Sequence, residues 1–207
     1  RRAILATDRG FQMLDLASGE TVQMADPENG HPETQYNDAK ADARGRFVCG
    51  TVHMPAQKPI GRLYCVEKGV VRVLEEGILI SNGPCWSPDG KTFYRADSAR
   101  KAIYAYDYDA ETGDLSGKRL FFSTEPHGGI PDGATVDTDG NYWTAVCEGA
   151  CVLCISPVGA LVHKIDMPSG WVSSVMFGGR ELDRLFVTSI NPASFGREGT
   201  EADGGLY

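Results

Sequence analysis

The feature that most restricts the fold of this chain is a repeat of short apolar strands, each of which begins after a turn glycine. Gly45, Gly90 and Gly140 each precede such a strand, and Gly179 marks a weaker fourth position, at steps of 45, 50 and 39 residues. A turn and a second short strand follow each first strand. Repeats of about 40–50 residues with four strands each are typical of β-propellers. The sequence therefore predicts an all-β chain built from propeller blades.

The composition of the strands and turns agrees with this prediction. Helical periodicity is almost absent, and segments rich in Val, Ile, Tyr and Phe alternate with Asp-Gly, Asn-Gly and Pro-Asp-Gly turns. Such alternation is typical of all-β proteins. The aromatic side chains of Trp86, Trp143 and Tyr106 fit the interior of blades. A β-sandwich would also contain many short strands, but it does not explain the constant spacing described next.

Three polar residues stand eight positions before the three turn glycines: Asn37, Asn82 and Asp132. The first strand of each propeller blade lines the central channel, so a residue just ahead of it, at equal phase in each blade, points toward the axis. We therefore expect the three side chains to converge at one mouth of the channel. Oxygen donors from separate blades suit a hard divalent cation. Taken singly, an Asn-Gly or Asp-Gly pair is equally typical of a tight turn.

Charge and hydropathy exclude two kinds of partner. The net charge is −8 and no block of Lys and Arg occurs, which argues against a nucleic-acid partner. No apolar run approaches the roughly 18 residues that a membrane span requires. Nucleic acid and membrane are therefore not expected as partners.

Other catalytic and metal-binding motifs are absent. The four histidines are scattered without an H-x-x-x-H pair, and no G-x-S-x-G segment occurs. The six cysteines lie mostly among apolar residues, as structural thiols do in a reducing cytoplasm. Cys147, Cys151 and Cys154 are closely spaced, but a second C-x2-C pair for zinc is missing. We therefore predict a cytoplasmic protein without a cysteine zinc site.

Several longer stretches resemble the senescence marker protein/gluconolactonase/regucalcin family, which includes luciferin-regenerating enzymes. They follow the family's order from about residue 35 to residue 190, and the most specific are NDAKADARGRFVCGT, ISNGPCWSPDGKTFYRADSARKAIYAYDYD and IPDGATVDTDGNYWTAV. The resemblance implies a six-bladed β-propeller that carries one divalent metal ion at the channel mouth, Ca²⁺ or Zn²⁺, with Mg²⁺ and Mn²⁺ as alternatives. It also implies a lactonase that opens sugar lactones to aldonic acids.

The resemblance also assigns roles to individual residues. In the family an Asn of the S-N-G motif and an Asp of the P-D-G motif bind the metal, which implies Asn82 and Asp132 here. An Asn of the preceding blade contacts substrate and corresponds to Asn37. Gln35 stands where sugar lactonases usually carry Arg; it can hydrogen-bond a hydroxyl or carbonyl but has no charge and no bidentate fork. The family's third metal ligand, a Glu in an early E-G-P-x-W-like segment, has no counterpart in this chain.

Together these observations predict a divalent-metal-dependent hydrolase that opens a small lactone by metal-activated water. Asp132 would be both a metal ligand and the catalytic base. Two further candidates for substrate binding are His127, five residues before Asp132, and Trp171, eight residues before Gly179. A loop histidine without a role and a tryptophan that fills a core remain alternatives. A different class of function also stays open: a non-catalytic metal-binding or protein-binding propeller module.

The length sets the expected domain organisation. Six blades of about 45 residues require roughly 270–300 residues, whereas 207 residues correspond to about four to four and a half blades. We therefore expect residues 1–207 to form a single β-propeller domain that is incomplete at both ends.

Overall fold

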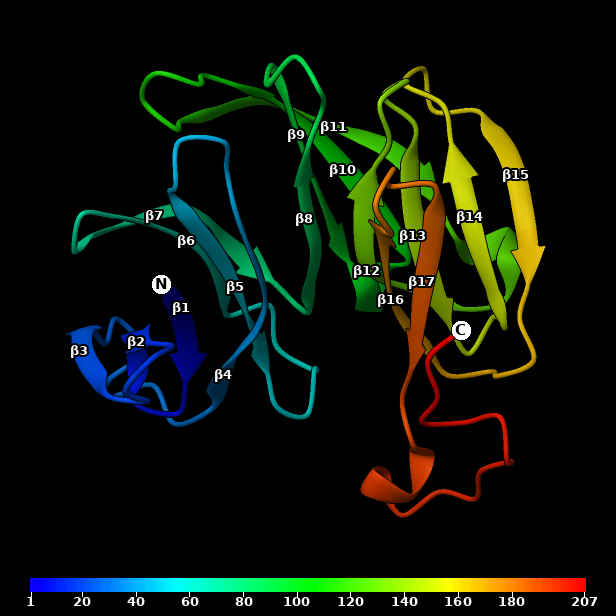
Figure 1. Cartoon of the computed structure of the whole chain (residues 1–207), viewed down its shortest axis with the longest axis horizontal. Helices are drawn as coiled ribbons and strands as arrows, with labels where there is room; N and C mark the ends of the chain where they lie inside the picture. Colours follow the sequence, from blue (N-terminus) through cyan, green and yellow to red (C-terminus); the bar gives the residue numbers. More distant parts are fainter.

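The computed structural model describes residues 1–207 and consists of seventeen strands in five antiparallel sheets (Figure 1). The first sheet contains β1 (Arg2–Thr7), β2 (Gly10–Asp15) and β3 (Thr21–Ala25). The second contains β4 (Thr34–Ala41), β5 (Phe47–His53), β6 (Gly61–Glu67) and β7 (Val70–Ile78). The third contains β8 (Ser81–Trp86), β9 (Thr92–Asp97), β10 (Ala102–Tyr108) and β11 (Leu115–Ser123).

The fourth sheet contains β12 (Ile130–Val136), β13 (Tyr142–Cys147), β14 (Cys151–Ile155) and β15 (Leu161–Asp166). The fifth pairs β16 (Val172–Gly178) with β17 (Arg184–Ser189). Three short 3₁₀ helices connect strands or follow them: η1 (Ser98–Arg100), η2 (Glu125–His127) and η3 (Pro192–Phe195). The predicted all-β class is therefore confirmed.

The sheets follow one another as the blades of a propeller do. Within each four-stranded sheet the strands pair in chain order, and the first strands of consecutive sheets are neighbours: β4 lies beside β8, β8 beside β12 and β12 beside β16. Figure 1 shows this succession from the blue sheet at the N-terminus to the orange pair β16 and β17. The first strands thus form the inner row of the molecule. The number of blades in a closed ring stays a prediction.

The hydrophobic core is divided among the interfaces between sheets. Phe11 and Tyr64 pack between the first and second sheets, and Leu63 and Phe93 between the second and third. Two further clusters join the third sheet to the fourth and the fourth sheet to the fifth. A β-sandwich would place one core between two sheets, so this alternative is excluded.

The three aromatic residues predicted to fill blade interiors do so. Tyr106 is buried and Trp86 packs against the same cluster between the second and third sheets. Trp143 packs against the cluster between the fourth and fifth sheets, and its Nε1 donates to Asp137 Oδ2 at 2.9 Å. Their aromatic surfaces therefore serve packing between blades.

The predicted turn glycines follow the inner strands, with one exception. Gly45, Gly90 and Gly140 have φ of 82°, 67° and 84°, and each donates its N–H to the carbonyl three residues earlier. In the fifth sheet Leu182 takes this place, with φ of 54° and its N–H directed at the carbonyl of Gly179. Gly179 therefore opens its turn, and the predicted phase of the fourth repeat is wrong by three residues. Glycine is the usual residue in this conformation, so the sequence pattern points to Gly179 and not to Leu182.

The six cysteines are all buried and unpaired, as predicted for structural thiols. Burial raises the pKa of the Cys154 thiol to about 11 and that of Cys147 to about 12. No group of three His, Cys, Asp or Glu side chains is arranged to hold a metal ion. The structure also contains no helix with the length and apolarity needed to cross a bilayer.

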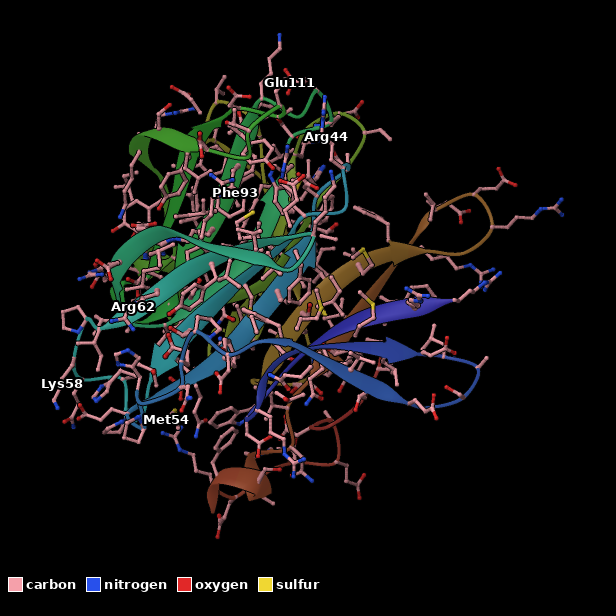
Figure 2. All side chains as sticks on the ribbon, turned by 90° about the vertical axis from the view of Figure 1, so that its left-hand side faces the viewer. Arg44, Met54, Lys58, Arg62, Phe93 and Glu111 are labelled. Atoms are coloured by element: carbon pink, nitrogen blue, oxygen red, sulfur yellow. The ribbon has the colours of Figure 1, made fainter.

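The inner strands give the molecule two distinct ends. Arg44, in the turn after β4, forms an ion pair with Glu111, in the turn after β10, and Figure 2 shows both side chains at one end. Met54 and Lys58, in the loop after β5, lie at the opposite end (Figure 2). That loop adjoins the start of β4, because Thr34 is paired with His53. The polar residues near the starts of the inner strands therefore belong to this second end.

Candidate functional site

The three predicted polar residues lie inside the inner strands. Asn37 is in β4, Asn82 in β8 and Asp132 in β12, and each stands at a shift in the register with the next strand of its sheet. The prediction placed them just ahead of the inner strand, and this is corrected: they stand within it, at a bulge. A bulge redirects a side chain and is common next to active sites. The Asn-Gly and Asp-Gly pairs therefore form strand bulges here, and the tight-turn alternative is wrong.

The glycines of these pairs allow the inner strands to approach one another. A Cβ atom on Gly83, which has φ of 57°, would lie 2.9 Å from the carbonyl oxygen of Asp132. A Cβ atom on Gly133 would lie 2.3 Å from Ser174 Oγ on β16. Both distances are shorter than real Cβ contacts, so only glycine fits without movement of the neighbouring strand. The motif glycines thus bring β8, β12 and β16 close together at the site.

A cavity of about 180 Å³ lies where these bulges meet. No hydrophobic side chain lines it. Its lining residues are Asn37, Asp38, Asn82, Asp132, Gly133, Ser173 and Ser174. The structure therefore brings Asn37, Asn82 and Asp132 together from three sheets.

Hydrogen bonds connect the amide side chains of neighbouring blades at this cavity. Asn37 Nδ2 donates to Asn82 Oδ1 at 2.7 Å and to the carbonyl of Ser81 at 2.9 Å. Asn82 is 7% exposed, whereas Asn37 is open to solvent. The buried amide of Asn82 is therefore held by its neighbours, and Asn37 forms the accessible rim of the cavity.

Two carboxylates give the cavity its electrostatic character. Asp38 Oδ2 accepts a hydrogen bond from the N–H of Gly83 at 2.8 Å, and its pKa is raised by burial. Burial, followed by the negative charge of Asp38, raises the pKa of Asp132 to about 7. Lys40 is the nearby cation that favours the ionised form of Asp38, but its Nζ donates to the carbonyl of Ala134 at 2.7 Å. Two carboxyl groups and no cationic side chain therefore line the cavity.

This donor set fits a hard divalent cation. The cavity offers carboxylate, amide and hydroxyl oxygens, and neither His nor Cys lines it. Oxygen-rich donors of this kind suit Ca²⁺, Mg²⁺ or Mn²⁺, and carboxylate oxygen also binds Zn²⁺. A cation between Asp132 and Asn82 would favour the ionised form of Asp132, whose pKa is raised by burial and by the charge of Asp38. The residues present therefore fit the metal ion that the family resemblance implies.

The fourth inner strand contributes serines to the cavity. Counting eight residues back from Leu182 gives Ser174, which lines the cavity together with Ser173. Trp171, the residue expected at this phase, precedes β16 and does not line the cavity. The guanidinium of Arg197 lies 5.0 Å from the centre of its indole ring. The structure thus places the two serines at the cavity and Trp171 outside it.

Two other predicted residues also lie outside this cavity. His127 ends η2 and its ring stacks on Phe122, with ring centres 5.7 Å apart. Gln35 precedes Asn37 by two residues on β4 and is exposed. It lines a larger cavity of about 840 Å³ beside β1, together with Asp8 and Asp26. Gln35 is therefore a neighbour of the site along the strand, whereas His127 belongs to a loop.

Three polar residues around the site were missed as site candidates: Asp38, Ser174 and Ser98. Asp38 directly follows Asn37, so its position beside a predicted site residue was the available signal. Ser174 would have been found if the fourth repeat had been aligned on Leu182. Ser98 Oγ accepts from Asn82 Nδ2 at 2.9 Å and donates to the carbonyl of Pro131 at 2.6 Å. No spacing in the sequence indicates these last contacts.

Comparisons with known proteins agree with this architecture. The family model of the SMP-30/Gluconolactonase/LRE-like region matches residues 1–191. The chain is 38% identical to pentonolactonase XacC of Haloferax volcanii over 83% of its own length and 59% of that protein. It is 35% identical to regucalcin of Danio rerio over 90% of its own length and 64% of that protein. The chain thus spans about 60% of the length of these curated relatives.

Solved structures show the same fold. A calcium-binding regucalcin from Agrobacterium tumefaciens superposes with a TM-score of 0.90 at 27% identity, over 99% of this chain and 70% of that one. A luciferin-regenerating enzyme superposes with a TM-score of 0.84 at 34% identity, over 91% of this chain and 66% of that one. The sheets, the bulged inner strands and the family match agree, and the chain belongs to the SMP-30/gluconolactonase/LRE-like family.

Proposed function

We propose that this chain forms the channel mouth of a divalent-metal-dependent hydrolase that opens a small sugar lactone. The observation that carries the proposal is the polar cavity that Asp132 and Asn82 line from neighbouring blades, with two carboxyl groups and no hydrophobic side chain in its lining. Relatives named pentonolactonase, 6-deoxy-6-sulfogluconolactonase and putative sugar lactone lactonase support the reaction class. The carboxyl, amide and hydroxyl groups in the lining can hydrogen-bond the hydroxyl groups of such a substrate.

Asn82 and Asp132 would hold the cation, which we infer to be Ca²⁺ or Zn²⁺, with Mg²⁺ or Mn²⁺ as alternatives. When bound, the cation supplies polarisation of the lactone carbonyl and acidification of the attacking water. Asn82 contributes a neutral oxygen, so the ligand set adds no second charge beside Asp132. Asp38 accepts hydrogen bonds from the backbone of β8 and β4, and these hold its carboxyl group in the lining of the cavity beside the two ligands.

Asp132 would also accept the proton of the attacking water. A carboxylate beside the attacking water can take up its proton in the transition state, and Asp132 lines the cavity. Its carboxylate faces the cavity from β12. The proton would therefore move from water to a carboxylate oxygen while the water oxygen attacks the lactone carbonyl. The bond between the carbonyl carbon and the ring oxygen would then break, and the ring oxygen would take up this proton to become a hydroxyl group of the open acid.

Residues at the rim of the cavity would orient the substrate. Asn37 is exposed beside Asn82 and can hydrogen-bond a substrate hydroxyl. Gln35, two residues earlier on the same strand, would contact the part of the substrate that extends toward the larger cavity. The hydroxyls of Ser173 and Ser174 complete the opposite wall. His127 and Trp171 lie outside the lining and have no role in this proposal.

The proposal also includes the ring to which the site belongs and the compartment in which the protein works. We infer a six-bladed ring, the number that the family resemblance implies, and the superposition on solved members of the family with TM-scores of 0.90 and 0.84 supports the shared fold. Six buried and unpaired cysteines fit a reducing compartment such as the cytoplasm.

Chelator-sensitive release of acid from lactones tests the proposed function. The chain is incubated with a panel of pentono- and hexonolactones and with Ca²⁺, Zn²⁺, Mg²⁺ or Mn²⁺, and acid release is followed with a pH indicator. We expect turnover above the rate of spontaneous hydrolysis, its loss on addition of EDTA, and its return with excess metal. Metal binding without turnover of any lactone would instead support a non-catalytic metal-binding module. Turnover unaffected by EDTA would contradict the metal-dependent mechanism.

A further inference from the structure

Ser98 lies behind the cavity and connects its two principal side chains. It is the first residue of η1, is 0% exposed and does not line the cavity. Its hydroxyl accepts from Asn82 Nδ2 at 2.9 Å and donates to the carbonyl of Pro131 at 2.6 Å. Pro131 directly precedes Asp132. One buried hydroxyl therefore links Asn82 on β8 to the backbone next to Asp132 on β12.

The hydrogen-bond pattern fixes which atom of the Asn82 amide faces Ser98. A serine hydroxyl has one hydrogen, and the carbonyl of Pro131 can only accept it. The lone pairs of Ser98 Oγ are then available only for a donor, so Asn82 must present its NH₂ group to Ser98. The amide oxygen consequently points to the opposite side, where Asn37 lies.

The hydrogen bonds of Asn37 independently require the same orientation of the Asn82 amide. Its Nδ2 donates to the carbonyl of Ser81 at 2.9 Å, so its NH₂ group must face β8. The same NH₂ group lies 2.7 Å from the Asn82 amide, which must therefore present an oxygen to it. Two backbone carbonyls, those of Pro131 and Ser81, thus determine one orientation of Asn82. A flipped amide would lose both hydrogen bonds in a residue that is only 7% exposed.

We propose that Ser98 is a positioning residue that fixes the orientation of the Asn82 amide, with its oxygen on the side of the cavity where Asn37 lies. The backbone supports this role: the N–H of Ser98 donates to the carbonyl of Ile80 at 3.0 Å, which joins η1 to the residue just before β8. The proposal rests on the proposed function, because the oriented oxygen of Asn82 is a ligand only if a cation binds there. Groups that orient metal ligands commonly affect metal affinity by 10- to 100-fold.

The affinity for Mn²⁺ alone, measured by isothermal titration calorimetry, tests this role without reference to turnover. Ser98→Ala is expected to weaken Mn²⁺ binding by about 10- to 100-fold. Ser87→Ala is the matched control, because Ser87 also makes two hydrogen bonds in the same blade but lies in the turn after β8. We expect the control variant to bind Mn²⁺ as the unchanged protein does. Equal affinity of the Ser98→Ala variant and the unchanged protein would overturn the proposal.

A double-mutant cycle separates positioning from general support of the fold. If Ser98 acts only through Asn82, Ser98→Ala should cause no further loss of Mn²⁺ affinity in an Asn82→Ala background. Losses that add in the double variant would contradict the positioning role. If Asn82→Ala alone leaves the affinity unchanged, the proposed metal site fails; if only Ser98→Ala leaves it unchanged, the inference about Ser98 fails.

A measurement on the unchanged protein covers the case in which Ser98→Ala does not fold. In protein labelled with ¹⁵N-asparagine, the side-chain amide hydrogens of Asn82 should exchange with deuterium more slowly than those of the exposed Asn29, because one hydrogen is bonded to Ser98. Exchange of both amides at the same rate would overturn the proposed contact.

Discussion

Asp132→Asn is expected to lower the rate of lactone turnover by at least about 100-fold, the lower end of the range for acid–base groups. The substitution keeps the size of the side chain but removes the negative charge and the proton acceptor together. The rate of acid release from the preferred lactone at saturating metal measures the effect. Turnover close to that of the unchanged protein, with the metal bound, would contradict the role of Asp132.

A neighbouring carboxylate provides the control for this prediction. Asp139 lies in the exposed turn of the same blade, after β12, and makes no contact with the cavity. Asp139→Asn changes the net charge by the same amount as Asp132→Asn. We expect its turnover to equal that of the unchanged protein, which would assign the loss in the Asp132 variant to the position of the charge.

The affinity for Mn²⁺ is expected to fall about 100-fold between pH 8 and pH 5. Burial and the charge of Asp38 raise the pKa of Asp132 to about 7, so a proton competes with the cation for this carboxylate below neutral pH. One competing proton weakens binding about tenfold for each pH unit below the pKa. Calorimetric titrations at several pH values give the slope. An affinity that does not change over this range would show that Asp132 is not a ligand with a raised pKa.

The same raised pKa makes a prediction for the stability of the metal-free protein. The pKa of Asp132 is higher in the folded chain, about 7, than the ordinary aspartate value of 3.8. Its neutral form therefore contributes stability that is fully present below about pH 4 and is lost as the pH rises through 7. Asp132→Asn stays neutral at every pH. At pH 8 the metal-free variant should thus unfold at a higher temperature than the unchanged protein, by on the order of 5 °C.

The difference between the two proteins isolates this effect from other titrating groups. The ion pair with Arg95 lowers the pKa of Glu75 to about 2, against the effect of burial. Glu75 therefore contributes stability that is lost as the pH falls, and it does so equally in both proteins. We expect the two unfolding temperatures to converge near pH 4 and to separate as the pH rises. A variant that is less stable than the unchanged protein at pH 8 would contradict the raised pKa.

The sequence could predict the strands and the repeat because both depend on local chemistry. Turn residues such as Gly90 and Gly140 must adopt positive φ, and short runs of β-branched and aromatic residues fill the interfaces between blades. The convergence of Asn37, Asn82 and Asp132 followed from their equal spacing before these turns. Periodic features of this kind survive in the sequence even where no single residue is distinctive.

The sequence could not predict features that depend on contacts between blades. Leu182 adopts a left-handed conformation that local preference assigns to glycine, so the fourth repeat was aligned on Gly179 and pointed to Trp171 instead of Ser174. The hydroxyl of Ser98 meets the carbonyl of Pro131 across 33 residues of sequence. Neither the bulges nor this contact follows from propensity, because both are set by how the inner strands pack against each other.

A crystal of the chain grown with Mn²⁺ would test most directly whether the converging oxygens form a metal site. We predict an anomalous-difference peak at the cavity, within about 2.0–2.6 Å of a carboxylate oxygen of Asp132 and of Asn82 Oδ1. A Mn²⁺ ion bound elsewhere, with the oxygens of Asp132 and Asn82 coordinating nothing, would contradict the account.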